Sequence, residues 1–282
     1  MKKILFITGF ILVAGMVFSK EDTLQISLYE RELLPASLAR LPQHSSFLAG
    51  RQPFASVAST SGEVERLSAT RFITPALFIA YGTAARFNDT PFRRFDKYVA
   101  EQVELNIDGH YPIDSYLAAV PAAVAYGLDF LPGVASQHNF RDRTLILATS
   151  YLFMWGTVTF MKQQIPVVRP RGWNSDAFPS GHTAVAFTGA HILYREYREQ
   201  SPWIGVGGYA VATMTGALRV INRAHWMSDI VAGAGIGILS AEIGYMMLPV
   251  WHSLFGIDDD RQLVIMPSVG ARNVGVGLVY LF

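Results

Sequence analysis

The sequence contains no cysteine, and only 16% of its 282 residues are charged. The absence of cysteine excludes a thiol nucleophile and a cysteine–zinc site, and it leaves the redox compartment undetermined. Basic and acidic residues nearly cancel, so the formal net charge of +1 gives no argument for binding nucleic acid. The chain is instead rich in apolar residues. Hydrophobic residues make up 51% of it, which is a high share for a soluble enzyme.

The N-terminus carries a pattern typical of a secretory signal peptide. Two lysines precede the apolar run 4–18, and Val17 and Ser19 stand where small residues precede a cleavage site before Lys20. An uncleaved membrane anchor is the alternative for residues 1–19. Either way, we expect the chain to be exported from the cytoplasm.

Residues 20–70 are polar and rich in small residues and proline, which predicts a loosely ordered arm. Beyond this arm the apolar runs are long and have helical periodicity. Six apolar helices are predicted, over residues 72–85, 115–128, 145–161, 183–194, 202–218 and 230–250. They define a predicted helical domain at 71–252.

A further helix is predicted from Thr90-Pro91 to about Asn106, because a threonine cap followed by a first-turn proline opens helices. This helix is amphipathic. Its predicted apolar face carries Phe92, Phe95, Val99 and Val103, and its predicted polar face carries Arg93, Arg94, Asp96 and Lys97.

The tail at 253–282 differs in kind. Residues 263–266 and 274–282 have the pattern of strands, with a turn at 270–273, and predict a short C-terminal β-hairpin. Two strands cannot close a barrel. The predicted fold class is therefore all-α, a bundle of about six apolar helices with a small hairpin attached.

Three clusters of charged and small residues stand out in the second half of the chain. In the first, six residues separate Lys162 from Arg169-Pro170; the second is Pro179-Ser180-Gly181-His182. In the third, five residues separate Arg219 from His225, and Asp229 follows four positions later. Arginine and lysine neutralise phosphoryl oxygens, and a helix start with free N–H groups binds anions. The clusters therefore indicate a site that binds and cleaves a phosphate ester.

These residues resemble the three-part signature KxxxxxxRP, PSGH and SRxxxxxHxxxD of the type 2 phosphatidic acid phosphatase superfamily. The resemblance covers roughly residues 71 to 250, and the order and internal spacings agree. One position departs, since Leu218 stands where the family usually has serine. We interpret this departure as the loss of a minor phosphate contact. The general look of the chain is similar to bacterial envelope lipid phosphatases, including lipid A phosphatases.

The resemblance implies a role for each matched residue. His225 is the implied nucleophile, His182 the implied general acid, and Asp229 the carboxylate that orients the His225 ring. The phosphate would be bound by residues from all three clusters: Lys162, Arg169, Ser180, Gly181 and Arg219. No metal or other cofactor is expected, because the protein supplies the positive charge.

Nearby residues have simpler interpretations. His191 is expected to be a hydrogen-bonded core residue, and Asp176 a loop carboxylate rather than a second acid. Arg171 and Arg223 flank matched positions, where contact with substrate is one interpretation and solvated surface charges the favoured one.

The sequence leaves the membrane topology open. Several apolar runs are shorter than the roughly 20 residues of a spanning helix, and Pro75 and Pro121 interrupt two of them. A membrane-embedded enzyme of the bacterial envelope with a periplasm-facing site is favoured, and a soluble periplasmic enzyme is the alternative.

The expected partners are a membrane and a phosphorylated lipid, of lipid A, polyprenyl diphosphate or phosphatidate type. A broad-specificity acid phosphatase is the second hypothesis, and a vanadium-dependent haloperoxidase the last.

Overall fold

The computed structural model describes residues 70–87, 90–172 and 174–257, together with the backbone of 262–269 and 274–281. The predicted export segment at 1–19, the predicted arm up to residue 69 and the turn at 270–273 lie outside the described residues. The described part of the chain is mostly helical, in agreement with the predicted fold class.

The elements follow one another along the chain with short connections. The helices are α3 (Thr70–Ala84), α4 (Pro91–Asn106), α5 (Asp114–Leu117), α6 (Val120–Gly127), the 3-10 turn η1 (Leu128–Phe130), α7 (Phe140–Gln164), α8 (Gly181–Tyr197), α9 (Pro202–Ile221) and α10 (Met227–Phe255). Strands β1 (Gln262–Val269) and β2 (Val274–Leu281) pair antiparallel, with Gln262 opposite Leu281.

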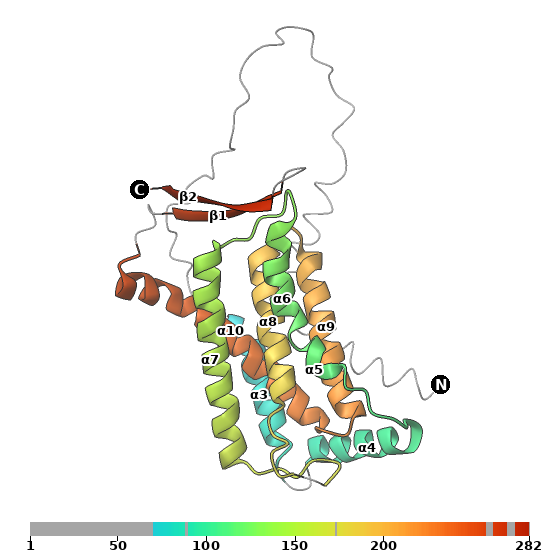
Figure 1. The fold of residues 1–282 in the computed structure, drawn as a ribbon. Helices are drawn as coiled ribbons and strands as arrows, with labels where there is room; N and C mark the ends of the chain where they lie inside the picture. The colour runs from blue at the N-terminus through green and yellow to red at the C-terminus, as the bar shows by residue number, and fades with distance from the viewer. Residues whose placement is uncertain (1–69, 88–89, 173, 258–261, 270–273, 282) are drawn as a thin grey trace, which may run out of the picture.

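Helix α10 is the central element of the structure. It packs against α3, α7 and α8, and α8 packs in turn against α9 (Figure 1). Because α7, α8, α9 and α10 run in alternating directions, the last turns of α7 and α9 meet the first turns of α8 and α10. All three residue clusters therefore fall at one end of the bundle, and α4 lies across that end.

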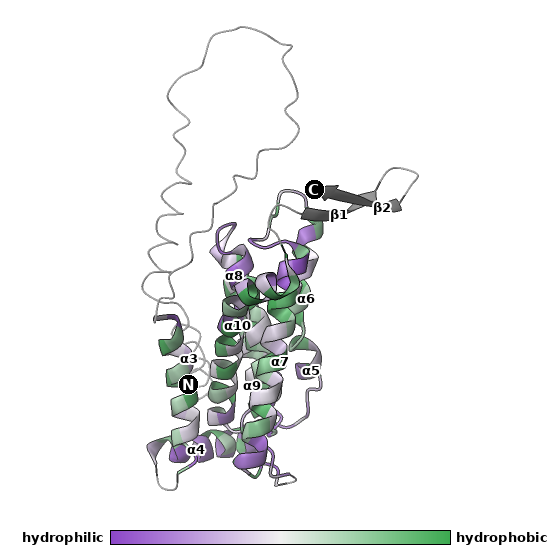
Figure 2. Ribbon diagram, turned by 90° about the vertical axis from the view of Figure 1, so that its left-hand side faces the viewer, coloured by the Kyte–Doolittle hydropathy of each residue, from purple (hydrophilic) through white to green (hydrophobic). Residues whose placement is uncertain are grey.

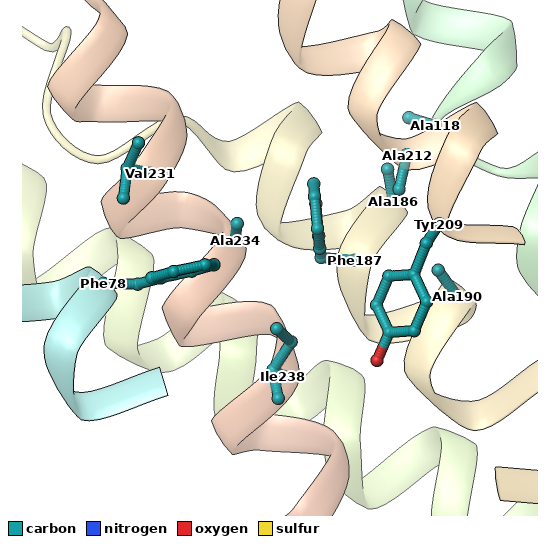
Figure 3. Packing of buried hydrophobic residues seen from close by; sticks show 10 residues of the cluster. All are labelled: Phe78, Ala118, Ala186, Phe187, Ala190, Tyr209, Ala212, Val231, Ala234 and Ile238. Carbon is teal, nitrogen blue, oxygen red and sulfur yellow. The ribbon is translucent and has the colours of Figure 1, made fainter. Parts of the chain in front are cut away.

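The core between these helices is built from small and aromatic side chains. Phe78 of α3 packs toward Val231, Ala234 and Ile238 of α10, and Phe187 of α8 lies on the other side of α10 (Figure 3). Alanines of α8 and α9 fill the space beside Tyr209.

Two glycines of α10 allow its backbone to touch that of α8. A Cβ atom at Gly233 would lie 2.6 Å from the carbonyl oxygen of Ser180, and one at Gly237 would lie 2.5 Å from that of Ala184. Only a residue without a side chain fits such an approach. The contact brings the N–H of Ser180 within 3.1 Å of the carbonyl oxygen of Asp229, so the second and third clusters share a hydrogen bond.

The predicted helix at 115–128 is wrong in one respect, because the structure divides it into α5 and α6. Pro121 lies in the first turn of α6, where its missing N–H costs no hydrogen bond. Helix α3 instead continues through Pro75. Helix α10 continues through Glu242, whose buried carboxylate accepts hydrogen bonds from Arg195 at 2.8 and 3.0 Å.

The predicted faces of α4 also need correction. Asp96 is buried together with Val99 and Val103, whereas the side chains of Phe92 and Phe95 are 40% and 43% exposed. The buried Asp96 accepts hydrogen bonds from the N–H and the hydroxyl of Ser228, at 2.9 and 2.5 Å. Hydrogen bonds to α10 thus replace the hydration that the carboxylate loses on burial.

The close approach of α8 and α10 is tested by adding one methyl group. Gly237→Ala places a Cβ atom 2.5 Å from the carbonyl oxygen of Ala184 and 2.9 Å from the N–H nitrogen of Thr188. Overpacking of this kind typically costs about 1–3 kcal/mol, so we expect a lower thermal unfolding midpoint in detergent.

Gly207→Ala on α9 is the matched control, because a Cβ atom there meets nothing within 4 Å. Alanine is favoured over glycine inside a helix by about 1 kcal/mol, so this variant should keep or raise the midpoint. Equal midpoints for the two variants would contradict the tight packing at Gly237.

Candidate functional site

The loop between α7 and α8 folds back on itself before it reaches the second cluster. The N–H of Val167 donates to the carbonyl of Ser175 at 2.8 Å, and the N–H of Ala177 donates to the carbonyl of Val167 at 2.9 Å. The chain reverses at Gly172, whose φ of +78° is a conformation that glycine adopts without strain. This reversal lays the two halves of the loop side by side.

The reversal places Arg169 and Lys162 against the same residue, Asp176. The guanidinium of Arg169 donates to both carboxylate oxygens of Asp176, from Nε at 2.9 Å and from Nη2 at 3.1 Å. Lys162, in the last turn of α7, donates from Nζ to the backbone carbonyl of Asp176. Asp176 is thus a loop carboxylate, as predicted. It occupies the parallel N–H donors of the Arg169 guanidinium, whose planar geometry also matches a phosphate group.

The second cluster opens α8. Ser180 is buried at the N-cap position, yet its hydroxyl lies 2.9 Å from the hydroxyl of Thr183 and makes no capping bond to a backbone N–H. Gly181 is the first residue of α8, and His182 follows it. The Nε2 atom of His182 lies 3.3 Å from the hydroxyl oxygen of Ser115.

The third cluster spans the end of α9 and the start of α10. Arg223 adopts a φ of +53°, and the chain turns there so that His225 folds back toward Arg219. The Nη2 atom of Arg219 lies 3.5 Å from the Nε2 atom of His225. His225 is only 2% exposed. It lies before α10 begins, whereas Asp229 is in the first turn of that helix, so the two residues do not lie on one helical face.

The orientation of the His225 ring is set by a backbone group. Its Nδ1 atom lies 2.7 Å from the carbonyl oxygen of Ala177. A carbonyl only accepts hydrogen bonds, so Nδ1 carries the proton and the lone pair is on Nε2. The nearest carboxylate oxygen of Asp229 is 3.7 Å from Nδ1, and this oxygen accepts a hydrogen bond from the N–H of Trp226 at 2.8 Å.

Both histidines are perturbed by the same set of positive charges. Burial, followed by the charges of Arg219, Lys162 and Arg169, holds the pKa of His225 well below its usual value. The pKa of His182 is lowered by burial and then by the same three cations, while the nearby carboxylate of Asp114 opposes the shift. The structure therefore brings the residues of all three clusters together. The described residues contain no group of three histidine, aspartate or glutamate side chains that could hold a metal ion.

Sequence reasoning missed a short segment that contacts the site from α5. Asp114 accepts hydrogen bonds from Arg219 at 2.8 Å and from Asn222 at 3.2 Å, and the next residue, Ser115, contacts His182. Asn222 also exchanges two hydrogen bonds with the backbone of Tyr111. A lone Asp-Ser pair has no sequence signature, so only the fold identifies it.

A second missed group lies behind Asp229. Arg86 is paired with one carboxylate oxygen of Asp229 at 3.1 Å and with Asp96 at 2.9 Å. Its guanidinium also contacts the hydroxyl of Ser228. The sequence contained one signal for the burial of Asp96, because Asp96, Val99 and Val103 follow the i, i+3, i+7 spacing of one helical face of α4.

Residues 143–253 match the family model described as the PAP2 superfamily, and this range contains all three clusters. A curated relative, the lipid A 1-phosphatase of Porphyromonas gingivalis, is 44% identical over 136 residues. The aligned part is 48% of this chain but only 31% of the relative, so the chain spans about a third of that protein.

Two solved structures resemble the chain more weakly. Aquifex aeolicus LpxE is 19% identical with a TM-score of 0.36, and the match covers 61% of this chain and 93% of that one. A transmembrane PAP2-type phosphatidylglycerolphosphate phosphatase from Bacillus subtilis is 16% identical with a TM-score of 0.38, over 66% of this chain and 98% of that one.

The contacts of Asp114 predict a shift in the pH profile. If His182 donates a proton, activity falls as pH rises through the His182 pKa in the substrate complex. The Asp114 carboxylate raises that pKa, so Asp114→Asn should move the basic limb of log kcat against pH to lower pH. The shift is measured with an alkyl phosphate, whose leaving group needs protonation.

Ser115→Ala removes the neighbouring hydroxyl without removing charge and is the matched control. It should move the basic limb less than Asp114→Asn does. A basic limb that stays in place in Asp114→Asn, with only a lower plateau, would show that Asp114 acts through Arg219 alone.

Proposed function

We propose that the helical domain is a PAP2-type domain and the catalytic part of a membrane phosphatase, a phosphoric ester hydrolase. Its substrates would be phosphate monoesters or diphosphates of envelope lipids, of lipid A, polyprenyl diphosphate or phosphatidate type. The observation that carries the proposal is the state of His225. This imidazole is buried, its Nδ1 proton is held by the carbonyl of Ala177, and its unprotonated Nε2 lies 3.5 Å from Nη2 of Arg219. The name of the Porphyromonas relative supports lipid A as one substrate class.

In the proposed first step, His225 Nε2 attacks the phosphorus atom. Negative charge on the phosphoryl oxygens would be stabilised by the side chains and backbone N–H groups of the clusters: Lys162, Arg169, Ser180, Gly181 and Arg219. The bond between phosphorus and the leaving oxygen breaks as His182 protonates that oxygen. The products are an alcohol and a phosphohistidine. For the phosphate to take the fork of Arg169, the carboxylate of Asp176 must share or yield it.

In the proposed second step, His182 has lost its proton and acts as a base. It takes a proton from a water molecule whose oxygen attacks the phosphorus, and the P–N bond breaks. Inorganic phosphate and neutral His225 result. The Ala177 carbonyl keeps the ring orientation throughout. Asp229, 3.7 Å from Nδ1, stabilises the positive charge that the ring carries in the intermediate.

The membrane assignment rests on three helices. Helices α7, α9 and α10 are long and apolar enough to cross a bilayer. Large apolar side chains of α7 are exposed, with Leu152 at 69%, Trp155 at 65% and Phe160 at 63%. Hydrophobic residues dominate the length of the bundle, and hydrophilic residues gather toward its ends (Figure 2). We place the helical domain at 71–252 in the membrane, with its catalytic end facing the periplasm. Residues 1–19 would direct the export of the chain.

The membrane location is tested by cell fractionation. Because apolar side chains of α7 would face lipid, the protein should remain in the membrane fraction after washes with high salt and with carbonate. Immunoblotting of the fractions checks this outcome. Recovery of the protein in the soluble periplasmic extract would favour the acid phosphatase hypothesis instead.

The roles of the two histidines are separated by single-turnover kinetics with two substrates. His225→Ala should abolish turnover of both an alkyl and an activated aryl phosphate, because no phosphoenzyme forms. His182→Ala should slow the alkyl substrate by about 10²–10⁴-fold more than the aryl one, because an aryl oxide leaves without protonation.

Rapid quenching with the aryl substrate supplies the second measurement. A labile phosphohistidine should accumulate in His182→Ala, where water is no longer activated, and should be absent in His225→Ala. His191→Gln is a suitable control, since His191 bonds Tyr209 and Glu242 in the core, away from the clusters. A phosphoenzyme in His225→Ala would show that another residue is the nucleophile.

A further inference from the structure

A cavity of about 160 Å³ adjoins the phosphate-binding arginines, enough for roughly five water molecules at their liquid volume. Its wall includes four arginines, Arg169, Arg171, Arg219 and Arg223, with His110 and two asparagines. Arg171 and Arg223 were interpreted from the sequence as surface charges. In the structure both are half-buried and line this cavity.

The cavity is not the reaction centre itself. Neither His225 nor His182 is among its lining residues. Arg169 and Arg219 belong to both places, so they form the boundary between the cavity and the proposed position of the reacting phosphate. A group in the cavity would therefore lie directly beside that phosphate.

The charges around the cavity are unevenly balanced. The carboxylates that pair with Arg169 and Arg219 belong to Asp176 and Asp114, and neither residue lines the cavity. Arg223 approaches Glu104 at 3.7 Å, but the side chain of Glu104 is 70% exposed, and such surface pairs are weak. The cavity itself is thus lined by positive and neutral groups.

The wall is also held in a fixed shape. Asn222 is buried and bonded to the backbone of Tyr111 on both its amide oxygen and its amide nitrogen, at 2.8 and 2.9 Å. The next residue, Arg223, is held in the left-handed region, which costs free energy in a residue with a side chain. The fold thus places Arg223 beside Arg219 despite their mutual repulsion.

We infer that this cavity binds a second anionic group of the substrate, a phosphate that is not itself hydrolysed. Guanidinium groups pair with phosphate through two parallel hydrogen bonds, and this cavity gathers four of them around one space. In a diphosphate, the terminal phosphorus would be attacked by His225 and the bridging P–O bond broken. The retained phosphate would then lie in the cavity. This inference rests on the proposed function and adds a preference for substrates with two anionic groups.

The test compares an alkyl monophosphate with the alkyl diphosphate of the same chain, in a neutral detergent. In the double variant Arg171→Gln, Arg223→Gln, kcat/KM should fall about 10- to 100-fold more for the diphosphate than for the monophosphate. Lysines at both positions keep the positive charge but lose the paired N–H donors of the guanidinium. They should give a ratio of diphosphate to monophosphate kcat/KM between those of the unmodified protein and the glutamine variant. Lys97→Gln, which removes an exposed cation of α4 outside the cavity, should leave the ratio unchanged.

Equal losses on the two substrates in the double variant would overturn the inference. So would a variant that only weakens inhibition by inorganic phosphate, because the cavity would then hold the free product. Failure of the proposed function looks different, since the unmodified protein would then turn over neither substrate. If the unmodified protein turns over both substrates and the double variant leaves the ratio of their kcat/KM values unchanged, the proposed function stands and only the inference about the cavity is overturned.

Discussion

The proposed phosphate site holds three positive charges close together, and like charges in an apolar protein repel one another strongly. Carboxylates behind the cations make the arrangement stable. Asp176 takes the fork of Arg169, and Asp114 pairs with Arg219 from 105 positions earlier in the chain. Lys162 donates instead to the backbone carbonyl of Asp176, so carboxylates and backbone groups around the cations are as much a part of the site as the cations are.

The same constraint explains why the helices approach so closely. The hydrogen bond between Ser180 and Asp229 joins the second cluster to the third, and it forms only because Gly233 leaves room for the backbone of α8. On the other side of Asp229, Arg86 links its carboxylate to Asp96 of α4. Packing and electrostatics therefore fix the same atoms, and a side chain added at the helix crossing would move both.

The sequence predicted the three clusters and the helices that carry them, because spacing within a helix or a short loop is a local property. It did not predict what those residues contact. The acceptor for the His225 ring proton is the carbonyl of Ala177, and backbone groups have no sequence signal. Asp114 reaches Arg219, 105 positions later in the chain, only through the fold. Asp96 was assigned to the polar face because it is charged, although its i, i+3, i+7 spacing with Val99 and Val103 indicated the buried face.

The two histidines of the proposed mechanism need opposite protonation states, and their surroundings supply the difference. His225 is 2% exposed and bonded through Nδ1 to a carbonyl, so it stays neutral and keeps its lone pair. His182 is less buried and lies beside the Asp114–Arg219 pair. In the free site, burial and the neighbouring cations lower its pKa. A bound phosphate dianion would offset those cations and raise the pKa of His182, so the substrate itself would favour the protonated acid that its leaving group requires.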